Sequence, residues 1–455
     1  MKIIVVGCGK VGISIIEQLS LEKHDVTVID FKADLVTDIS NRFDVMGYVG
    51  NGASAATLSE AGASETELLI AVTDSDEINL LCCLFAKKAG IKSTIARVRD
   101  PRYSDEVPFI KEELGLSLVL NPDYDAAREI ARLMRFPSAD KIDTFAKGRV
   151  ELLKFEVAEG SILEGKSLID IGKQVGTDVL ICAVSRGDEV IIPNGIFRLE
   201  RGDMINVIAS SQAARVFCKK IGVETHQVKD CIIAGGGRTA FYLAQQLLLS
   251  GVAVKIIESD RDRCESLAEQ LPKATIICGD ATNQEILLEE GIEQAEGFVS
   301  LTGMDEGNMF LSLYAKKCSK AKVVTKLNYF ASNDIVKNFN LGSIITPKNI
   351  SADLVVSYAR ARQNSIDYGE SNVETLYKIV DNKVEALEFK VSKNSPVAGV
   401  PVLQLKLKPD ILLGCIIKGK KMSIVNGQSV INEGDTVIVI TTRKGLKDIR
   451  DILAQ

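Results

Sequence analysis

The chain begins with a short apolar run that leads into closely spaced glycines. Residues 1–12 read MKIIVVGCGKVG, and a helix is expected to begin at the end of this segment. A second apolar run, DVTVID, ends in the acidic residue Asp30. The order of strand, glycine turn, helix and strand predicts an α/β domain with a doubly wound parallel sheet, a fold that binds nucleotides at its first turn.

The same order occurs a second time in the middle of the chain. Residues 229–240 read KDCIIAGGGRTA, and the next apolar run, AVKIIE, ends in Glu258. Matching residues are separated by 228 or 229 positions, and the match continues through later polar positions such as Asn79 and Asn308. A common offset with common polar residues indicates an internal repeat, because unrelated α/β segments would not keep the offset.

A smaller unit follows each copy and also recurs. It alternates short β-branched runs with turns such as Asn194-Gly195 and Asn426-Gly427, a pattern typical of small antiparallel sheets. A chain of 455 residues would hold about three domains of ordinary size, but the two repeats predict four. We expect two Rossmann-like doubly wound parallel-sheet domains, each followed by a small β-rich (α+β) domain. The expected ranges are 1–137, 138–225, 226–367 and 368–455.

Composition and charge restrict the possible partners. The net charge is −6 and no long basic stripe occurs, so no nucleic acid partner is expected. The longest apolar stretches, such as 80–86 and 411–417, are much shorter than the ~18 residues of a membrane span, so direct membrane insertion is not expected. The ten cysteines are scattered without C-x-x-C spacing, which indicates buried thiols in a reducing cytosol.

In the first copy, the glycines have the spacing of a dinucleotide-binding loop. Gly7 would permit a tight turn, Gly9 would let the backbone approach a pyrophosphate, and Gly12 would let helix and strand pack closely. The phosphates would lie at the helix N-terminus, where free N–H groups and the helix dipole favour anions. Asp30 would accept hydrogen bonds from ribose hydroxyls and repel a 2′-phosphate, which favours NAD(H) or ATP/ADP over NADP(H).

The second copy departs from the first in its loop and in its acidic residue. Ala240 replaces the third glycine, Gly236 adds flexibility to the loop, and Glu258 is longer than the aspartate of the first copy. We expect both sites to bind nucleotide and the first to be better formed. A threonine after the fourth strand, Thr73 or Thr302, is expected at the edge of each sheet where ligands bind.

The sequence offers no obvious residues for hydride-transfer catalysis. A dehydrogenase needs a general acid or base at the nicotinamide and a substrate pocket. His24 is expected between the first helix and second strand, away from the ligand edge, and His226 in a linker. No Tyr-x-x-x-Lys pair, metal-ligand cluster or Walker A loop occurs. This favours a nucleotide sensor over an enzyme. An NAD-dependent oxidoreductase and a soluble adenylate-sensing protein without a membrane partner remain the alternatives.

Several of these motifs together resemble the TrkA family, the cytosolic regulators of Trk-type potassium uptake. The resemblance rests on the opening GCGKVG, on Asp30, on VTDSDEIN at 72–79, on IARVR at 95–99 and on the tandem order, and it covers essentially the whole chain. The larger units resemble RCK (KTN) NAD-binding domains, and the smaller units resemble RCK C-terminal domains. The resemblance implies a peripheral protein on the inner face of the cell membrane that binds NAD(H) and adenine nucleotides (ATP/ADP). It also implies gating of a potassium-translocating membrane subunit of the TrkH or TrkG type, and assembly into a homo-oligomeric ring.

The resemblance further implies two sets of nucleotide-binding residues. The first set is Gly7, Cys8, Gly9, Lys10, Val11, Asp30, Thr73, Asp74 and Arg97. The second set is Gly235, Gly236, Gly237, Arg238, Thr239, Glu258, Thr302, Gly303 and Lys326. A lysine in place of the arginine and the altered loop leave the ligand of the second site open.

Two helical patterns close the larger units. They begin at Pro122 and Pro347, carry apolar residues at helical spacing and end in pairs of arginines. Each helix can pack on the core of its own unit or be exchanged between units, and the sequence does not decide between these alternatives.

Overall fold

The computed structural model divides into two compact units. Unit 1 combines Met1–Ala131 with Lys229–Ala359, and unit 2 combines Arg132–Val228 with Arg360–Gln455. The residues that the structure describes are 1–137, 139, 141–145, 150–175, 178–187, 189–222, 226–329, 336, 339–368, 373–379, 383–393, 395–419, 421–446 and 448–454. Two of the expected domain limits, 138 and 225, lie outside the described residues.

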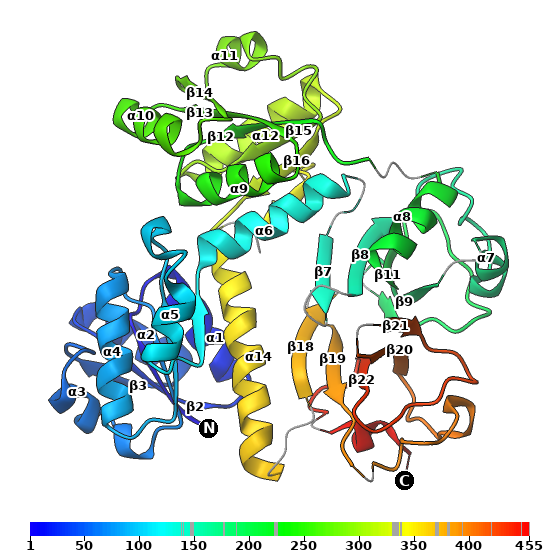
Figure 1. Ribbon diagram of the computed structural model, residues 1–455, viewed down its shortest axis with the longest axis horizontal. Coiled ribbons are helices and arrows are strands. Elements are labelled where there is room, and N and C mark those ends of the chain that lie inside the picture. The colour runs from blue at the N-terminus through cyan, green and yellow to red at the C-terminus, as the bar shows by residue number, and fades with distance from the viewer. Residues whose placement is uncertain are drawn as a thin grey trace. The chain divides into compact units, whose positions relative to one another are not determined.

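Unit 1 contains two parallel six-stranded sheets with one common strand order (Figure 1). The orders are β3-β2-β1-β4-β5-β6 and β14-β13-β12-β15-β16-β17. The first sheet consists of β1 (Lys2–Val6), β2 (Asp25–Asp30), β3 (Met46–Val49), β4 (Leu68–Ala71), β5 (Ser93–Arg97) and β6 (Leu118–Leu120). The second consists of β12 (Asp230–Ala234), β13 (Ala253–Glu258), β14 (Thr275–Cys278), β15 (Gly297–Ser300), β16 (Lys322–Lys326) and β17 (Ser343–Ile345). The order reverses beside β1 and β12, and ligands of such sheets bind at the carboxyl ends of the strands at this point.

Helices connect the strands of each sheet. In the first repeat they are α1 (Lys10–Leu21), α2 (Ala33–Phe43), α3 (Ala55–Glu60), α4 (Asp76–Lys88), α5 (Val107–Glu113) and α6 (Pro122–Arg135). In the second repeat they are α9 (Arg238–Leu249), α10 (Arg261–Gln270), α11 (Gln284–Glu289), α12 (Asp305–Cys318) and α14 (Pro347–Tyr368). Side chains of β1 point alternately into two apolar clusters, Ile3 and Val5 into one and Ile4 and Val6 into the other. A parallel strand covered on both faces has this arrangement, so the doubly wound fold predicted from the sequence is confirmed.

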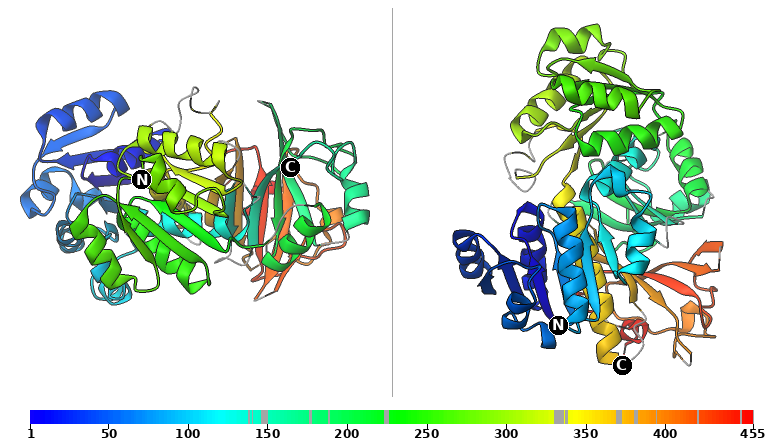
Figure 2. Two further views of the ribbon diagram at one scale, coloured as in Figure 1. Left: turned by 90° about the horizontal axis from the view of Figure 1, so that it is seen from above. Right: turned by 60° about the vertical axis from the view of Figure 1, so that its left-hand side comes forward.

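Helix α14 packs against the first sheet. Its buried residues Ala352, Val355 and Val356 belong to the same apolar cluster as Ile3 and Val5. Figures 1 and 2 show α14, in yellow, running alongside the blue first repeat. Of the two alternatives left open by the sequence, exchange between the repeats is the one observed for this helix.

The start of α6 makes the reciprocal contact with the second repeat. The ring of Tyr124 in α6 meets that of Tyr242 in α9 edge-on, with ring centroids 5.5 Å apart. The amide Nδ2 of Asn121, just before α6, donates to the Tyr242 hydroxyl at 3.2 Å. The closing helix of each repeat therefore contacts the other repeat.

Unit 2 contains two five-stranded antiparallel sheets. Their orders, β10-β9-β11-β8-β7 and β18-β19-β22-β20-β21, are the same order read from opposite ends. The strands are β7 (Lys141–Phe145), β8 (Val150–Glu156), β9 (Val179–Arg186), β10 (Glu189–Ile191), β11 (Met204–Ala209), β18 (Val373–Ile379), β19 (Val384–Lys390), β20 (Ile411–Lys418), β21 (Lys421–Ile424) and β22 (Thr436–Thr441). Helices α7 (Leu168–Val175) and α8 (Ser211–Lys220) accompany the first of them. Residues of both sheets, including Leu152 and Ala386, share one apolar cluster. The small β-rich domains expected from the sequence are confirmed.

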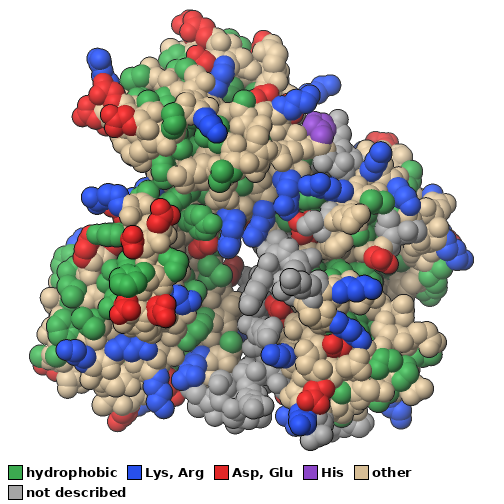
Figure 3. Space-filling view, in the orientation of Figure 1, with side chains coloured by type: hydrophobic (Ala, Val, Ile, Leu, Met, Phe, Trp, Pro, Cys, Tyr) green, Lys and Arg blue, Asp and Glu red, His purple; other side chains and the backbone are tan. Residues whose placement is uncertain are grey.

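The cysteines are mostly buried, and the surface carries charges of both signs. Eight of the ten cysteines are buried, and all ten are free thiols. Burial raises the pKa of Cys8 to about 12, so this thiol stays neutral at physiological pH. Basic and acidic side chains are interspersed with apolar ones on the face drawn in Figure 3. Among the helices that the structure describes, none has an apolar stretch long enough to cross a bilayer.

Candidate functional site

The two glycine loops lie at the carboxyl ends of β1 and β12. Gly7 and Gly235 both have φ +100°, a left-handed conformation that side chains strongly disfavour. A Cβ atom added at Gly7 would lie 2.8 Å from the amide nitrogen of Thr73. At Gly235 it would lie 3.0 Å from the amide nitrogen of Thr302. Each first glycine is therefore required for the turn and for the close approach of the segment that follows the neighbouring strand, β4 or β15.

The helices that follow the loops have N-termini suited to an anion. Their N-cap residues are Gly9 and Gly237, which have no side chain to accept hydrogen bonds from the first-turn N–H groups. By contrast, Ser75 caps α4 and Asp260 caps α10 with their side chains. Among the described residues, a Cβ atom at Gly9 or Gly237 would have no neighbour within 4 Å, so a ligand can approach the backbone. The arrangement fits the phosphates of a nucleotide.

Lys10 and Val11 begin α1, as Arg238 and Thr239 begin α9. Their N–H groups belong to the first turn of each helix, where a phosphate is expected. Lys10 and Arg238 are exposed, whereas Thr239 is buried.

The acidic residues at the ends of β2 and β13 are bonded to the loops. Oδ2 of Asp30 accepts a hydrogen bond from the N–H of Cys8 at 2.8 Å. Oε2 of Glu258 accepts from the N–H of Gly236 at 2.6 Å. The longer Glu258 therefore reaches the same loop amide that Asp30 reaches, and side-chain length alone does not distinguish the two sites.

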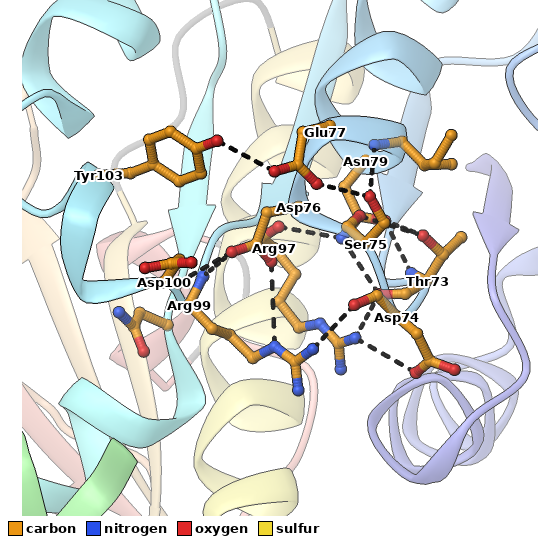
Figure 4. Close-up of polar contacts among 12 residues, drawn as sticks. Thr73, Asp74, Ser75, Asp76, Glu77, Asn79, Arg97, Arg99, Asp100 and Tyr103 are labelled. Atoms are coloured by element: carbon orange, nitrogen blue, oxygen red, sulfur yellow. Dashed lines mark hydrogen bonds and ion pairs between the residues drawn. The ribbon is translucent and has the colours of Figure 1, made fainter. Parts of the chain in front are cut away.

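A buried arginine lies at the carboxyl end of β5, at the ligand edge of the first sheet (Figure 4). Arg97, at the end of β5, is 5% exposed, and its Nη2 donates to the carbonyl oxygen of Thr73. Its nearest carboxylate is the exposed Asp74, with 3.8 Å between Nη2 and Oδ1. Burial, and after it the neighbouring Arg99, lower the pKa of Arg97 to about 10, so the group stays protonated at neutral pH. The Nε of Arg97 is buried and makes no hydrogen bond to a described residue.

The corresponding position of the second site is Lys326. Its Nζ donates to the carbonyl oxygen of Leu301 at 3.0 Å, and burial lowers its pKa. Lysine presents a point charge, whereas arginine presents a planar set of donors. Gly303 follows Thr302 and is exposed.

Two buried asparagines organise these residues, a role that the sequence repeat did not specify. Oδ1 of Asn79 accepts from the N–H of Thr73 at 2.7 Å, and its Nδ2 donates to the carbonyl oxygen of Arg97 at 3.0 Å (Figure 4). Asn308 makes the same two contacts with Thr302 at 2.8 Å and Lys326 at 3.0 Å. The only sequence signal was the matching position of the two asparagines in the repeats.

Asp76 and Asp305 fix the segments after β5 and β16. Oδ2 of Asp76 accepts from the backbone N–H groups of Arg99 at 2.8 Å and Asp100 at 2.9 Å. Oδ2 of Asp305 accepts from the N–H of Tyr329 at 2.7 Å. Buried carboxylates thus hold the backbone after β5 and after β16 in the same way.

Sequence reasoning missed one further contact at the second loop. Nε of Arg263 in α10 donates to the carbonyl oxygen of Gly236 at 2.7 Å. The corresponding position of the first repeat is Leu35, so the repeat gave no signal for this residue. The two histidines lie away from both loops: His24 is in the turn after α1, and His226 is exposed before β12.

Gly12 allows a specific prediction about loop packing. A Cβ atom there would lie 2.0 Å from the carbonyl oxygen of Gly7, yet the second repeat has Ala240 at this place. We expect Gly12→Ala to lower the free energy of unfolding by about 1–3 kcal/mol, because the loop must move to admit the methyl group. Thermal denaturation would measure the change, and Ala240→Gly is the matched control. Equal stability of Gly12→Ala and the unsubstituted protein would contradict the close packing.

The repeated architecture defines a class of protein. Two Rossmann-like domains with nucleotide-type loops are each followed by a small antiparallel domain in one chain. Family models agree with this division: the TrkA-N domain matches residues 3–122 and 231–347, and the TrkA-C domain matches residues 152–222 and 386–454. The chain belongs to the TrkA family.

Relatives and solved structures give the same result. A Trk system potassium uptake protein TrkA homolog from Archaeoglobus fulgidus is 30% identical over 456 residues, covering 99% of this chain and all of the relative. The Trk system potassium uptake protein TrkA of Halomonas elongata is also 30% identical, over 99% of this chain and 98% of the relative. A structure of the GsuK channel bound to NAD superposes with a TM-score of 0.63 at 17% identity, over 97% of this chain and 77% of that one. The GsuK RCK domain gives 0.62 at 16% identity, over 97% of this chain and 92% of that one. These structures show the RCK fold.

Proposed function

We propose that this protein is a nucleotide-sensing regulatory subunit that gates a Trk-type potassium uptake protein in the membrane. The observation that carries the proposal is the repeated site: each glycine loop presents an uncapped helix N-terminus and a carboxylate bonded to the loop. Relatives matched over almost the whole chain are named Trk system potassium uptake proteins. A ligand at these sites would change the partner through different affinities for two states of the assembly.

The ligands we propose are NAD(H) and ATP or ADP. The first site would use Gly7 to Val11 for phosphate, Asp30 for ribose, and Thr73, Asp74 and Arg97 at the edge of the sheet. The buried, incompletely paired Arg97 supports an anionic ligand there. The second site would use Gly235 to Thr239, Glu258, Thr302, Gly303 and Lys326.

The role we propose is regulatory and not enzymatic. Both histidines lie away from the loops, and the polar residues of the sites are engaged in holding the backbone. We further propose a location on the inner face of the cell membrane, held there by a potassium-translocating subunit of the TrkH or TrkG type. The protein would act as a homo-oligomeric ring, with domains at 1–137, 138–225, 226–367 and 368–455.

Potassium flux gives the direct test of this function. Liposomes that contain the purified membrane subunit should take up potassium at a rate that changes with ATP or NADH only when this protein is added. Calorimetry on the protein alone should show binding of at least one of these nucleotides. Nucleotide-independent flux, or sustained oxidation of NADH with a panel of carbonyl substrates, would contradict the proposal.

A further inference from the structure

Two cysteines lie next to the acidic residue of the second site. The carbonyl oxygen of Glu258, at the end of β13, accepts from the N–H of Gly279 at 2.8 Å. The same oxygen accepts from the Sγ of Cys264 in α10 at 3.2 Å. Cys278 directly precedes Gly279 and pairs with Glu258 in the parallel register of β13 and β14. Both cysteines are therefore held at the ligand edge of the second sheet, around one carbonyl group.

The two thiols lie on the same face of this sheet. Ile277 belongs to the apolar cluster that contains Leu287 of α11 and Leu311 of α12. Neighbouring side chains of a strand point to opposite faces, so Cys278 faces α10, which packs against β14. Burial, and after it a hydrogen bond with the thiol of Cys278, raise the pKa of Cys264 to about 11. Cys264 is therefore a neutral thiol at physiological pH and has a second thiol as its direct neighbour.

The two cysteines differ in their access to solvent. All ten cysteines lie in the described part of the chain, and Cys278 is the only exposed one among them. Cys264 is 6% exposed. An accessible thiol beside a buried one is the arrangement of a redox-sensitive pair, in which the first thiol meets the oxidant and the second resolves the product.

The first repeat has valines in both places. Val36 and Val49 correspond to Cys264 and Cys278, at the repeat offsets of 228 and 229 positions. Valine has no thiol, so the cysteine pair distinguishes the second site from the first. The first site is therefore an internal control for a response to oxidation.

We propose that Cys264 and Cys278 form a redox-sensitive dithiol, which a peroxide oxidises to a disulfide, and that this disulfide weakens nucleotide binding at the second site. The effect on nucleotide binding rests on the proposed function. The sulfur of Cys278 attacks hydrogen peroxide and the O–O bond breaks, which leaves a sulfenic acid and one water. The sulfur of Cys264 then attacks the sulfenic sulfur, and its proton leaves with the hydroxyl group as a second water. The two thiols thus lose two electrons, which reduce one peroxide to two waters.

The disulfide would act on the second site through α10. A disulfide holds its sulfurs at bonding distance, closer than two hydrogen-bonded thiols, so the start of α10 must move towards β14. Arg263 directly precedes Cys264, and its Nε donates to the carbonyl oxygen of Gly236 at 2.7 Å. Glu258, whose carbonyl oxygen would lose the Cys264 thiol, holds the same loop through the N–H of Gly236 at 2.6 Å. Oxidation therefore disturbs two contacts that hold the second glycine loop.

The first measurement detects the disulfide. Full-length protein treated with hydrogen peroxide should give one linked pair of peptides, carrying Cys264 and Cys278, in mass spectrometry. Dithiothreitol should separate the two peptides again. Cys278→Ser should give no linked peptide at Cys264. Oxidation of Cys278 to a sulfinic acid without a linked peptide, or a disulfide with a different cysteine, would overturn the proposal.

The second measurement follows nucleotide affinity by calorimetry. In Asp30→Ala, which weakens the first site, oxidation should lower the affinity for ATP or NADH about tenfold, because a hydrogen bond to a charged group is lost. Dithiothreitol should restore the affinity, and adding Cys278→Ser should abolish the response. In Glu258→Ala, which reports on the first site, oxidation should change the affinity less than about twofold.

The outcomes separate the dithiol from the function on which its effect rests. If the reduced protein binds neither ATP nor NADH, the proposed function fails, and the linked peptides still decide whether the dithiol exists. If the disulfide forms and the nucleotide affinity of the second site stays the same, the effect of oxidation on that site is overturned. Thermal denaturation shows that Cys278→Ser is folded, which is expected because Cys278 is exposed.

Discussion

Asp30→Ala is expected to lower the affinity of the first site for NADH or ATP by roughly ten- to hundredfold. The carboxylate lies at the end of β2, where ribose hydroxyls would donate to it, and it already accepts from the N–H of Cys8 at 2.8 Å. Losing a hydrogen bond to a charged group costs ~1.5–3 kcal/mol, which corresponds to that loss of affinity. Calorimetry should show that the tighter class of sites has disappeared.

Glu258→Ala is the matched control and should leave most of the high-affinity binding. Both carboxylates accept hydrogen bonds from their loops, so the acids do not explain a difference in nucleotide affinity. The expected difference depends on Arg97, which offers several donors, whereas Lys326 offers a single point charge. Asp30→Asn separates loop support from ribose binding, since asparagine retains an acceptor oxygen for Cys8 N–H. A larger loss from Glu258→Ala than from Asp30→Ala would mean that the second site is the main sensor.

The fold could be predicted because local patterns determine it. Apolar runs such as IIVV at 3–6, followed by glycines, require a covered strand and a left-handed turn at Gly7, and the structure has both. Because the sequence repeats, the same strand and the same turn are expected in the second copy. The identical strand orders of the two parallel sheets, and of the two antiparallel sheets, follow from the repeat.

The exchange of closing helices could not be predicted, because it depends on contacts between distant segments. Ala352 and Val355 are small and apolar at helical spacing, which suits any helix-sheet core equally well. Nothing in the sequence near α14 identifies Ile3 and Val5 as the residues they cover. The same limit applied to Asp123, whose partner Thr239 is 116 positions away in the chain.

Individual site residues fall between these two cases. The repeat showed that Asn79 and Asn308 match, but not what they bond. Their role depends on strand ends brought together by the sheet, since Asn79 joins the end of β4 to the end of β5. Glu258 illustrates the converse: it is longer than Asp30, yet its Oε2 accepts from the loop N–H of Gly236 at 2.6 Å, as Asp30 accepts from the N–H of Cys8.

Asn79→Ala is expected to have a large effect on the stability of unit 1. The side chain is fully buried and makes four hydrogen bonds, three with Thr73 and one with the carbonyl oxygen of Arg97. Alanine would leave the N–H of Thr73 and the carbonyl of Arg97 without this partner in a buried position. Each such loss costs about 1–3 kcal/mol, so we expect the free energy of unfolding to fall by about 3–5 kcal/mol.

The measurement is chemical denaturation of the full chain, with nucleotide binding followed in parallel. Nucleotide affinity of the first site should fall as well, because Asn79 positions both Thr73 and Arg97. Asn194→Ala is the control, since Asn194 is exposed and its side chain accepts one hydrogen bond in a turn, from the N–H of Ile196. Asn308→Ala should reproduce the loss of stability while sparing the first site, because it holds Thr302 and Lys326 through the same contacts. Equal stability of Asn79→Ala and Asn194→Ala would contradict this role. Other contacts would then hold the end of β4 against the end of β5.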